Sequence, residues 1–189
     1  MTMAGIHRKQ GEERQPEDFY ATDPAAVPPL LKLLGPEYES GCKLIYEPAC
    51  GKGHISQILE LYGHQVVSTD LIDRGYGIGG IDFLNPTPFD AVKFDAVITN
   101  PPFKYATQFI EKSLQIAPLV CMLLRLAFVE SERRDKFFED YPPRYIAVFR
   151  RRVRTSKNAL FPDGESSATC HAWFIWERGY KGNPELVRI

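Results

Sequence analysis

The chain has 189 residues, which is the usual size of a single domain and enough to bury a sizeable core. Hydrophobic residues make up 44% and charged residues 25%, which is ordinary for a globular protein. A formal net charge of −1 excludes a basic field over the whole surface, so any nucleic-acid binding needs a local patch.

No apolar stretch approaches the length that spans a bilayer, and the N-terminal residues form no apolar signal region. We therefore expect a cytoplasmic protein that does not enter a membrane. The four cysteines show no CxxC pair and no His/Cys zinc spacing, so they predict no metal site: Cys42, Cys50, Cys121 and Cys170. In a reducing compartment we expect buried thiols and no disulfide.

Residues 1–16 are polar and charged and lack apolar periodicity, which predicts a flexible arm ahead of one domain over 17–189. Asp23 followed by Pro24 predicts the start of a helix, because aspartate caps helix N-termini and proline suits the first turn. Three leucines at helical spacing then supply its apolar stripe.

Strands and helices alternate after this helix. We expect a strand at 43–47, a helix at 54–62 and a strand at 65–69. Since a glycine loop joins the first strand to the helix, the unit implies parallel strands with a right-handed crossover. Residues 70–80 contain four glycines and predict a flexible loop, which could cover a bound ligand as a lid.

The second half of the chain supplies the rest of the sheet. We expect strands at 81–83, 94–99 and 119–126, helices at 105–117 and 130–140, and closing strands in 145–153 and 170–177. The unbroken apolar run at 119–126 is typical of a strand buried on both faces. This order predicts a Rossmann-like α/β fold, with a mostly parallel sheet of about seven strands and helices on both faces.

The first motif, Glu47-Pro48-Ala49-Cys50-Gly51-Lys52-Gly53, joins the predicted strand to the helix. Glycine removes the Cβ that would keep a nucleotide-like cofactor from the backbone, and a helix N-terminus favours negative groups. Asp70, at the end of the next strand, can accept hydrogen bonds from both ribose hydroxyls. A bare GxG is also common in tight turns, so the glycines alone leave both interpretations open.

The second motif, Asn100-Pro101-Pro102-Phe103, follows the predicted strand at 94–99. Pro101 forces Asn100 into an extended conformation, and neither proline has an N–H of its own. The asparagine oxygen and a proline carbonyl can then accept both hydrogens of one amine, while Phe103 offers a flat face to its ring. The same residues can also form a simple turn. Their position relative to the first motif decides between a turn and an amine-binding site.

In this order and spacing, the two motifs resemble those of the S-adenosylmethionine (AdoMet) dependent amino-methyltransferases, especially small phage-type N6-adenine DNA methyltransferases. Phe19-Tyr20-Ala21-Thr22 resembles their amino-terminal motif, and residues 124–128 and 171–177 also look like phage counterparts. The likeness covers roughly residues 18–180. It leaves no room for the separate target-recognition domain of larger members.

The resemblance implies a role for each matching residue. Phe19, Tyr20 and Thr22 would close over the methionine end of AdoMet. Asp70 would bind the ribose, and Asp82 with Phe83 the adenine, although Phe83 is equally expected as a core aromatic. The full implied cofactor set is Phe19, Tyr20, Thr22, Glu47, Pro48, Cys50, Gly51, Gly53, Asp70, Leu71, Asp82 and Phe83. Catalysis would rest on Asn100, Pro101, Pro102 and Phe103.

The implied reaction is direct in-line methyl transfer to N6 of adenine in DNA, with the base flipped out of the duplex. A cluster of basic residues suits phosphate contacts, and the expected nucleic-acid set is Arg125, Arg150, Arg152, Arg154 and Lys157. The cluster is also compatible with a solvated strand end. Adenine in RNA, a protein glutamine, or a non-catalytic AdoMet- or nucleic-acid-binding role are the alternatives. We expect His171 to be structural.

Overall fold

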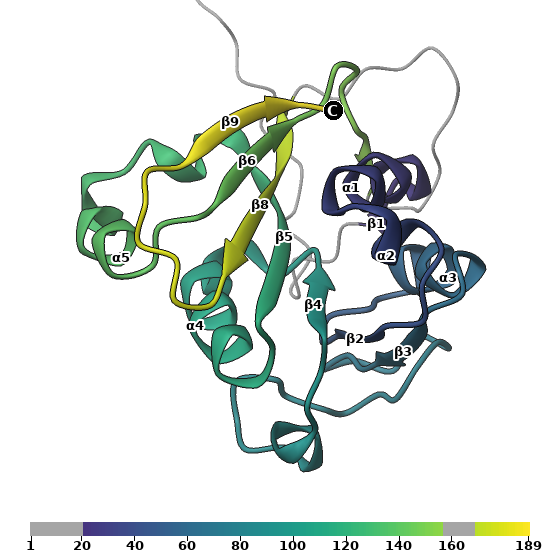
Figure 1. The fold of residues 1–189 in the computed structure, drawn as a ribbon. Coiled ribbons are helices and arrows are strands. Elements are labelled where there is room, and N and C mark those ends of the chain that lie inside the picture. Colours follow the sequence, from purple (N-terminus) through teal and green to yellow (C-terminus); the bar gives the residue numbers. More distant parts are fainter. Residues whose placement is uncertain (1–20, 157–168) are drawn as a thin grey trace, which may run out of the picture.

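The computed structural model describes residues 21–156 and 169–189. In this part of the chain a seven-stranded sheet has the order β3-β2-β4-β5-β8-β6-β9 (Figure 1). Four of its six pairings are parallel, and β8 runs antiparallel to both neighbours. The strands are β2 (Leu44–Glu47), β3 (Gln65–Ser68), β4 (Ala96–Thr99), β5 (Leu119–Arg125), β6 (Tyr145–Val148), β8 (His171–Glu177) and β9 (Glu185–Arg188).

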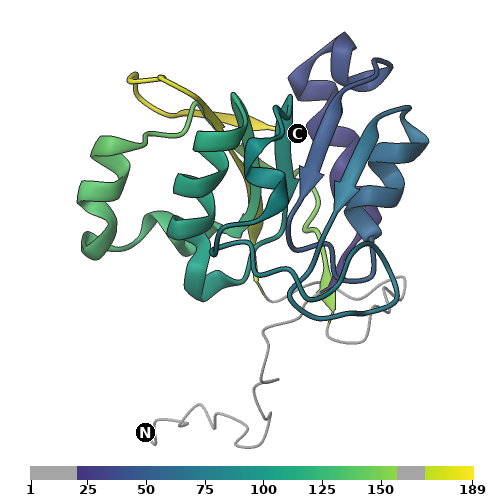
Figure 2. The same ribbon diagram turned by 90° about the horizontal axis from the view of Figure 1, so that it is seen from below.

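Helices lie on both sides of this sheet, with α1, α2 and α3 on one side and α4 and α5 on the other (Figure 2). The helices are α1 (Val27–Leu34), α2 (Pro36–Glu39), α3 (His54–Leu61), α4 (Ala106–Ile116) and α5 (Asp135–Asp140). A separate pair of short strands, β1 (Ala21–Thr22) and β7 (Thr155–Ser156), runs antiparallel. The expected fold class is confirmed.

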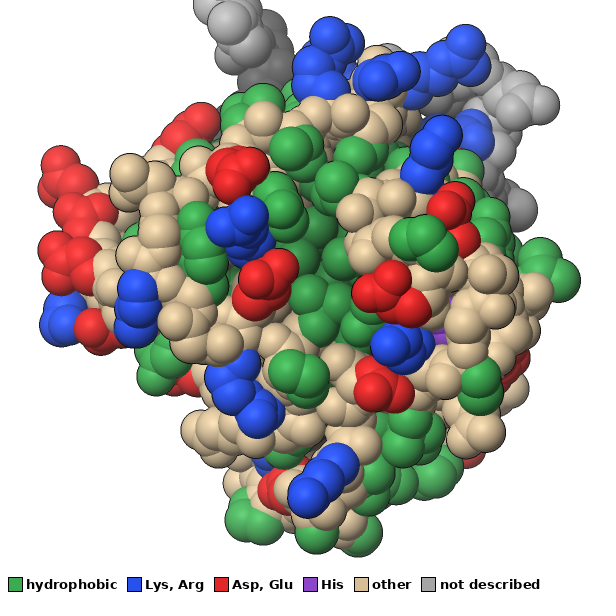
Figure 3. All heavy atoms as spheres, viewed as in Figure 1, with side chains coloured by type: hydrophobic (Ala, Val, Ile, Leu, Met, Phe, Trp, Pro, Cys, Tyr) green, Lys and Arg blue, Asp and Glu red, His purple; other side chains and the backbone are tan. Residues whose placement is uncertain are grey.

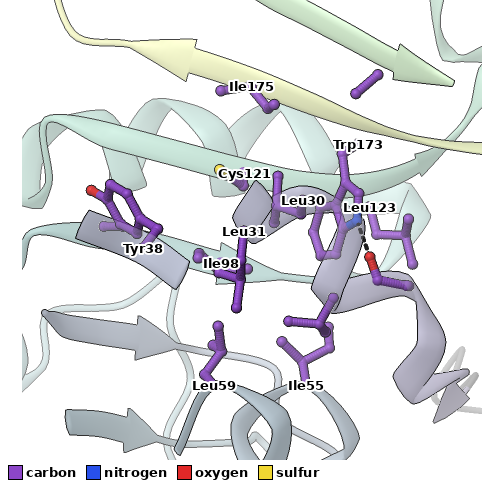
Figure 4. Close-up of a cluster of buried hydrophobic side chains, with 14 of the residues drawn as sticks. Leu30, Leu31, Tyr38, Ile55, Leu59, Ile98, Cys121, Leu123, Trp173 and Ile175 are labelled. Atoms are coloured by element: carbon purple, nitrogen blue, oxygen red, sulfur yellow. Dashed lines mark hydrogen bonds between the residues drawn. The ribbon is translucent and has the colours of Figure 1, made fainter. Parts of the chain in front are cut away.

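The core consists of two apolar layers, because alternate residues of each buried strand point to opposite faces. In β5, Cys121 and Leu123 pack toward α1 and α3, whereas Val120, Met122 and Leu124 pack toward α4. All five are at most 1% exposed, as expected for a strand buried on both faces. Figure 4 shows the first layer.

One buried hydrogen bond ties that first layer to the amino-terminal segment. The Trp173 indole donates to the Ala26 carbonyl over 2.8 Å (Figure 4). Ala26 ends the short 3-10 turn Pro24–Ala26, where the Asp23 carboxylate accepts from the Ala25 amide as the predicted cap. The start of the chain's helical segment is therefore fixed against β8.

Two expectations about the elements are wrong, and two further elements are present but shorter than expected. Residues 81–83 form no strand, because the Asp82 carboxylate accepts from the Leu84 amide and its carbonyl from Asn85, which turns the chain. The seventh strand is β9, which was not expected. The expected helix at 130–140 begins only at Glu132, with a 3-10 turn that leads into α5, and the Arg134 side chain donates back to the Phe128 carbonyl. The closing strand β6 ends at Val148 instead of 153.

All four cysteines are free, but two of them were wrongly expected to be buried. Cys50 and Cys121 are buried, whereas Cys42 and Cys170 are exposed because both lie in connections outside the sheet. Among the described residues, no helix combines the length and apolar character needed to traverse a bilayer.

Candidate active site

A cavity of about 510 Å³ opens where β2, β3 and β4 end. Parallel strands present their carboxyl ends at one edge, so the segments that follow them meet there. Among the residues that line it are thirteen expected site residues: Thr22, Glu47, Pro48, Cys50, Gly51, Asp70, Leu71, Asp82, Phe83, Asn100, Pro101, Pro102 and Phe103. Phe19, Tyr20 and Lys157 lie outside the described residues.

The glycine loop after β2 is held by the residue that ends the next strand. The Gly51 amide donates to one oxygen of the Asp70 carboxylate over 2.8 Å, and the Ile72 amide donates to the other over 2.9 Å. Gly51 has a φ of +56°, a conformation that favours glycine. Asp70 therefore shapes the loop as well as lining the cavity.

Behind the loop, Glu47 is 1% exposed and anchors the start of α3. One oxygen of its carboxylate accepts from the Ser56 amide over 2.9 Å and from the Ser56 hydroxyl, which also bonds Ser68 over 2.6 Å. Burial raises the pKa of Glu47 to about 8, and the hydrogen bonds from Ser56 only partly offset this. The carboxyl is thus largely protonated near neutral pH in the absence of a ligand.

Gly53 does not line the cavity, so room for a cofactor is not the reason for a glycine at this position. A Cβ on Gly53 would overlap the Tyr76 ring, and its φ of +80° disfavours any side chain. The loop that carries Tyr76 is itself fixed, because Ile78 exchanges backbone hydrogen bonds with Ser68 and Asp70. Residues 75–80 are absent from the cavity lining, so their position does not support the lid interpretation.

The second motif begins where β4 ends, and one distant and one local hydrogen bond hold it. The Asn100 amide nitrogen donates to the Thr22 hydroxyl over 3.0 Å. The Pro102 carbonyl accepts from the Tyr105 amide over 2.9 Å and starts the 3-10 turn Phe103–Tyr105. Of the two proline carbonyls, that of Pro101 is therefore the better candidate acceptor for a ligand amine.

Phe103 is flanked by two residues from the other strands of this edge. The Arg125 guanidinium lies over its ring, 4.4 Å from the centroid, and the His171 ring is stacked at 6.3 Å. Burial, and then the charge of Arg125, lower the pKa of His171 to about 4, so it is neutral at pH 7. Its neighbours are consistent with the expected structural role.

Phe83 is both a core and a lining residue. It is 2% exposed, and its ring centroid lies 4.9 Å from that of Phe109. Asp82 uses its two carboxylate oxygens on the Leu84 amide and the Asn85 side chain. Sequence reasoning missed His54 and Arg74 as lining residues, since neither is among the motif residues to which a role was assigned.

The basic segment, residues 150–154, follows β6. Since β8 is antiparallel to both β5 and β6, these two strands run in the same direction, and the segment lies at the same edge of the sheet as the cavity. Arg150, Arg151 and Arg152 are exposed, and Lys and Arg side chains gather along the upper margin of the face in Figure 3. Arg154 differs, because its Nε pairs with the Asp23 carboxylate at 3.0 Å. Its side chain is 23% exposed.

No protein-family model and no curated protein matches this chain. Among solved structures, it resembles the methyltransferase subunit of a type I restriction-modification system from Streptococcus thermophilus, with a TM-score of 0.66 and 12% identity over 93% of this chain and 48% of that one. It also resembles a candidate class I S-adenosylmethionine-dependent methyltransferase from Listeria monocytogenes, with a TM-score of 0.59 and 16% identity over 84% of this chain and 62% of that one. For a candidate RNA methyltransferase from Pyrococcus horikoshii, the TM-score is 0.52 and the identity 16% over 79% of this chain and 81% of that one.

The chain thus spans less than two thirds of the Listeria protein and about half of the Streptococcus subunit. At such low identities these likenesses speak for the fold and leave the chemistry to the residues of the site. The protein has the Rossmann-like fold of the S-adenosylmethionine-dependent methyltransferases.

Proposed function

We propose that the protein is an AdoMet-dependent amino-methyltransferase that transfers a methyl group to N6 of adenine in DNA. The observation that carries the proposal is that Asn100, Pro101, Pro102 and Phe103 line the same cavity as Gly51 and Asp70. A cofactor loop and an amine clamp in one cavity is the arrangement that such a transfer needs, since the two reactants must meet in line.

The residues present fit a nucleoside cofactor. The cavity volume of about 510 Å³ is typical of small-molecule sites. Asp70 presents a carboxylate at the cavity wall for the ribose, and Asp82 and Phe83 stand beside it for the adenine. When bound, AdoMet supplies an electrophilic methyl group on its sulfonium.

The clamp residues act on the adenine amine. Oδ1 of Asn100 and the Pro101 carbonyl accept its two hydrogens, which draws the nitrogen toward tetrahedral geometry and makes its lone pair available. The Pro101 carbonyl is held by the proline-stiffened backbone, and the Asn100 side chain is held by its hydrogen bond to Thr22, so both acceptors can stabilise the transition state with little reorganisation. No covalent intermediate on the protein is needed, in keeping with the buried Cys50, whose thiol pKa burial raises to about 12.

DNA is the proposed substrate because the exposed Arg150 and Arg152 lie at the clamp's edge of the sheet, where they can hold phosphates. Since a duplex hides the amine of adenine, the target nucleotide has to be flipped out. The Streptococcus relative, by its name, belongs to a restriction-modification system. Adenine in RNA is the second candidate, favoured by the name of the Pyrococcus relative.

The test is incubation of the protein with methyl-labelled AdoMet and, separately, duplex DNA, RNA and protein substrates, followed by nucleoside and amino-acid analysis. We expect N6-methyladenine in DNA. Asn100→Ala should lose about 10²- to 10³-fold in rate, the usual cost of deleting one transition-state hydrogen bond. Asn183→Ala, which changes an exposed residue away from the cavity, should keep the parent rate. AdoMet binding without any transfer would instead establish a non-catalytic protein.

A further inference from the structure

We propose that Thr22 is a positioning residue for Asn100, and that the Arg154–Asp23 ion pair holds Thr22 in place. The inference deepens the proposed function and rests on it for the identity of the amine substrate. It starts from one contact between residues 78 positions apart: the Asn100 amide nitrogen donates to the Thr22 hydroxyl over 3.0 Å. Thr22 is 4% exposed and lines the cavity.

The orientation of the Asn100 amide decides whether the clamp works. An asparagine amide has one accepting end and one donating end, and rotation about its last bond exchanges them. An amine substrate brings two N–H donors, so the oxygen must face it. With the nitrogen turned to Thr22, the oxygen is directed elsewhere. The reversed amide would present its own donor to the donating amine of the substrate.

Thr22 can play this part only if the short strand that carries it stays in place. β1 has just two residues, and in the described structure it pairs with β7, which immediately follows the basic segment. Directly beside Thr22, the Asp23 amide donates to the Arg154 carbonyl over 3.1 Å, and Arg154 Nε donates to the Asp23 carboxylate over 3.0 Å. These contacts connect Arg154, at the end of the basic segment, to Asn100 through Asp23 and Thr22.

Arg154 therefore has a different task from its exposed neighbours Arg150 and Arg152. Its guanidinium is already committed through Nε to a partly buried carboxylate, with side-chain exposures of 23% and 12%. Such a pair is screened less by salt than a fully exposed one. Arg154 acts on the rate through Thr22, whereas Arg150 and Arg152 act on nucleic-acid affinity.

The test compares Thr22→Val, which keeps the shape and removes the hydroxyl, with Thr22→Ser, which retains it. Thr107→Val on α4 is the matched control, since that threonine lies outside the cavity. At saturating AdoMet and DNA, Thr22→Val should lower the single-turnover rate about 3- to 10-fold, the factor of one neutral hydrogen bond. Thr22→Ser should restore most of it. Equal rates for Thr22→Val and the parent would overturn the proposal.

Arg154→Gln should lower the same rate, with partial rescue by Arg154→Lys, while the salt dependence of DNA binding keeps the parent slope. Arg150→Gln should instead reduce that slope. If Arg154→Gln reduced the slope and spared the rate, Arg154 would be a phosphate ligand and the proposed link would be wrong. Thermal denaturation of every variant separates these effects from loss of folding.

A readout independent of activity separates this inference from the proposed function. The NMR signal of the Asn100 side-chain amide, assigned by its loss in Asn100→Ala, should shift and exchange faster with solvent in Thr22→Val. That result in a protein that methylates nothing would sustain the positioning role and refute the proposed reaction. An unchanged amide signal would refute the positioning role even in an active enzyme.

Discussion

The guanidinium of Arg125 lies over the ring of Phe103, 4.4 Å from its centroid. The sequence predicted that Phe103 would stack on the substrate base and that Arg125 would contact nucleic acid. In the structure the two residues touch each other, so part of the ring is already covered. The base must then stack on the remaining surface of an arginine–aromatic pair, which arginine planes and aromatic rings both allow.

Replacing both members of this pair should give non-additive losses. Phe103→Ala should weaken binding of DNA by about 1–3 kcal/mol, the usual value of one base–aromatic stack. A double-mutant cycle of Arg125→Ala and Phe103→Ala should show a coupling of about 0.5–2 kcal/mol. Fluorescence anisotropy with labelled duplexes gives all four affinities. Full additivity would mean that Arg125 contacts phosphate independently of Phe103.

Asp70 should contribute strongly to AdoMet affinity. Its carboxylate lines the cavity and accepts from the Gly51 amide, so Asp70→Ala removes a charged acceptor and loosens the glycine loop. We expect a loss of about 1–3 kcal/mol in binding, measured by calorimetry. Asp73→Ala, an exposed acidic residue outside the cavity lining, is the matched control. Equal effects of the two substitutions would remove Asp70 from the binding site.

Glu47 should make the protein less stable as pH rises. Its pKa is about 8 in the folded state against 4.5 for the unfolded side chain, so the folded state binds the extra proton between these values. The free energy of unfolding therefore falls from about pH 4.5 to about pH 8 and then levels off. Urea denaturation at several pH values should show this decline in the parent and in Glu111→Gln, an exposed control on α4, but a weaker one in Glu47→Gln. Parallel curves for all three proteins would contradict the prediction.

Gly53→Ala should destabilise the fold through two separable effects. A side chain at a φ of +80° costs about 1–3 kcal/mol, and the new Cβ also meets the Tyr76 ring. Adding Tyr76→Ala relieves the overlap but leaves the backbone strain, so the double variant should be more stable than the sum of the two single losses. Denaturant titration measures this coupling. If the losses simply added, Tyr76 would not be the reason for the glycine.

The exposed arginines of the basic segment should control the salt dependence of DNA binding. Each phosphate that they neutralise contributes about 0.9 to the slope of log K against log salt concentration on duplex DNA. Replacing Arg150 and Arg152 together with glutamine should reduce that slope by up to roughly two such increments. Since phosphate contacts carry no sequence information, the parent should methylate adenine in many contexts. Sequencing of methylated sites on random DNA checks this, and one long, tightly defined motif would contradict it.

The sequence by itself determined the fold class and most of the cavity wall. Local patterns were enough for this, because a strand that precedes Gly51 and another that precedes Asn100 must, in a parallel sheet, end at the same edge. The absence of a strand at 81–83 was beyond such reasoning, since Asp82 turns the chain through hydrogen bonds that compete with pairing. The strand β9 was missed because its two apolar residues, Leu186 and Val187, are adjacent and give no alternating pattern.

Only the tertiary structure decided which functional residues touch one another. Thr22 meets Asn100, Tyr76 fills the space above Gly53, and Arg154 pairs with Asp23 across more than a hundred residues. Sequence motifs give the chemistry of a residue and its place on an element, because both depend on near neighbours. The partner of a side chain depends on how distant segments pack, and that follows from the burial of the whole core.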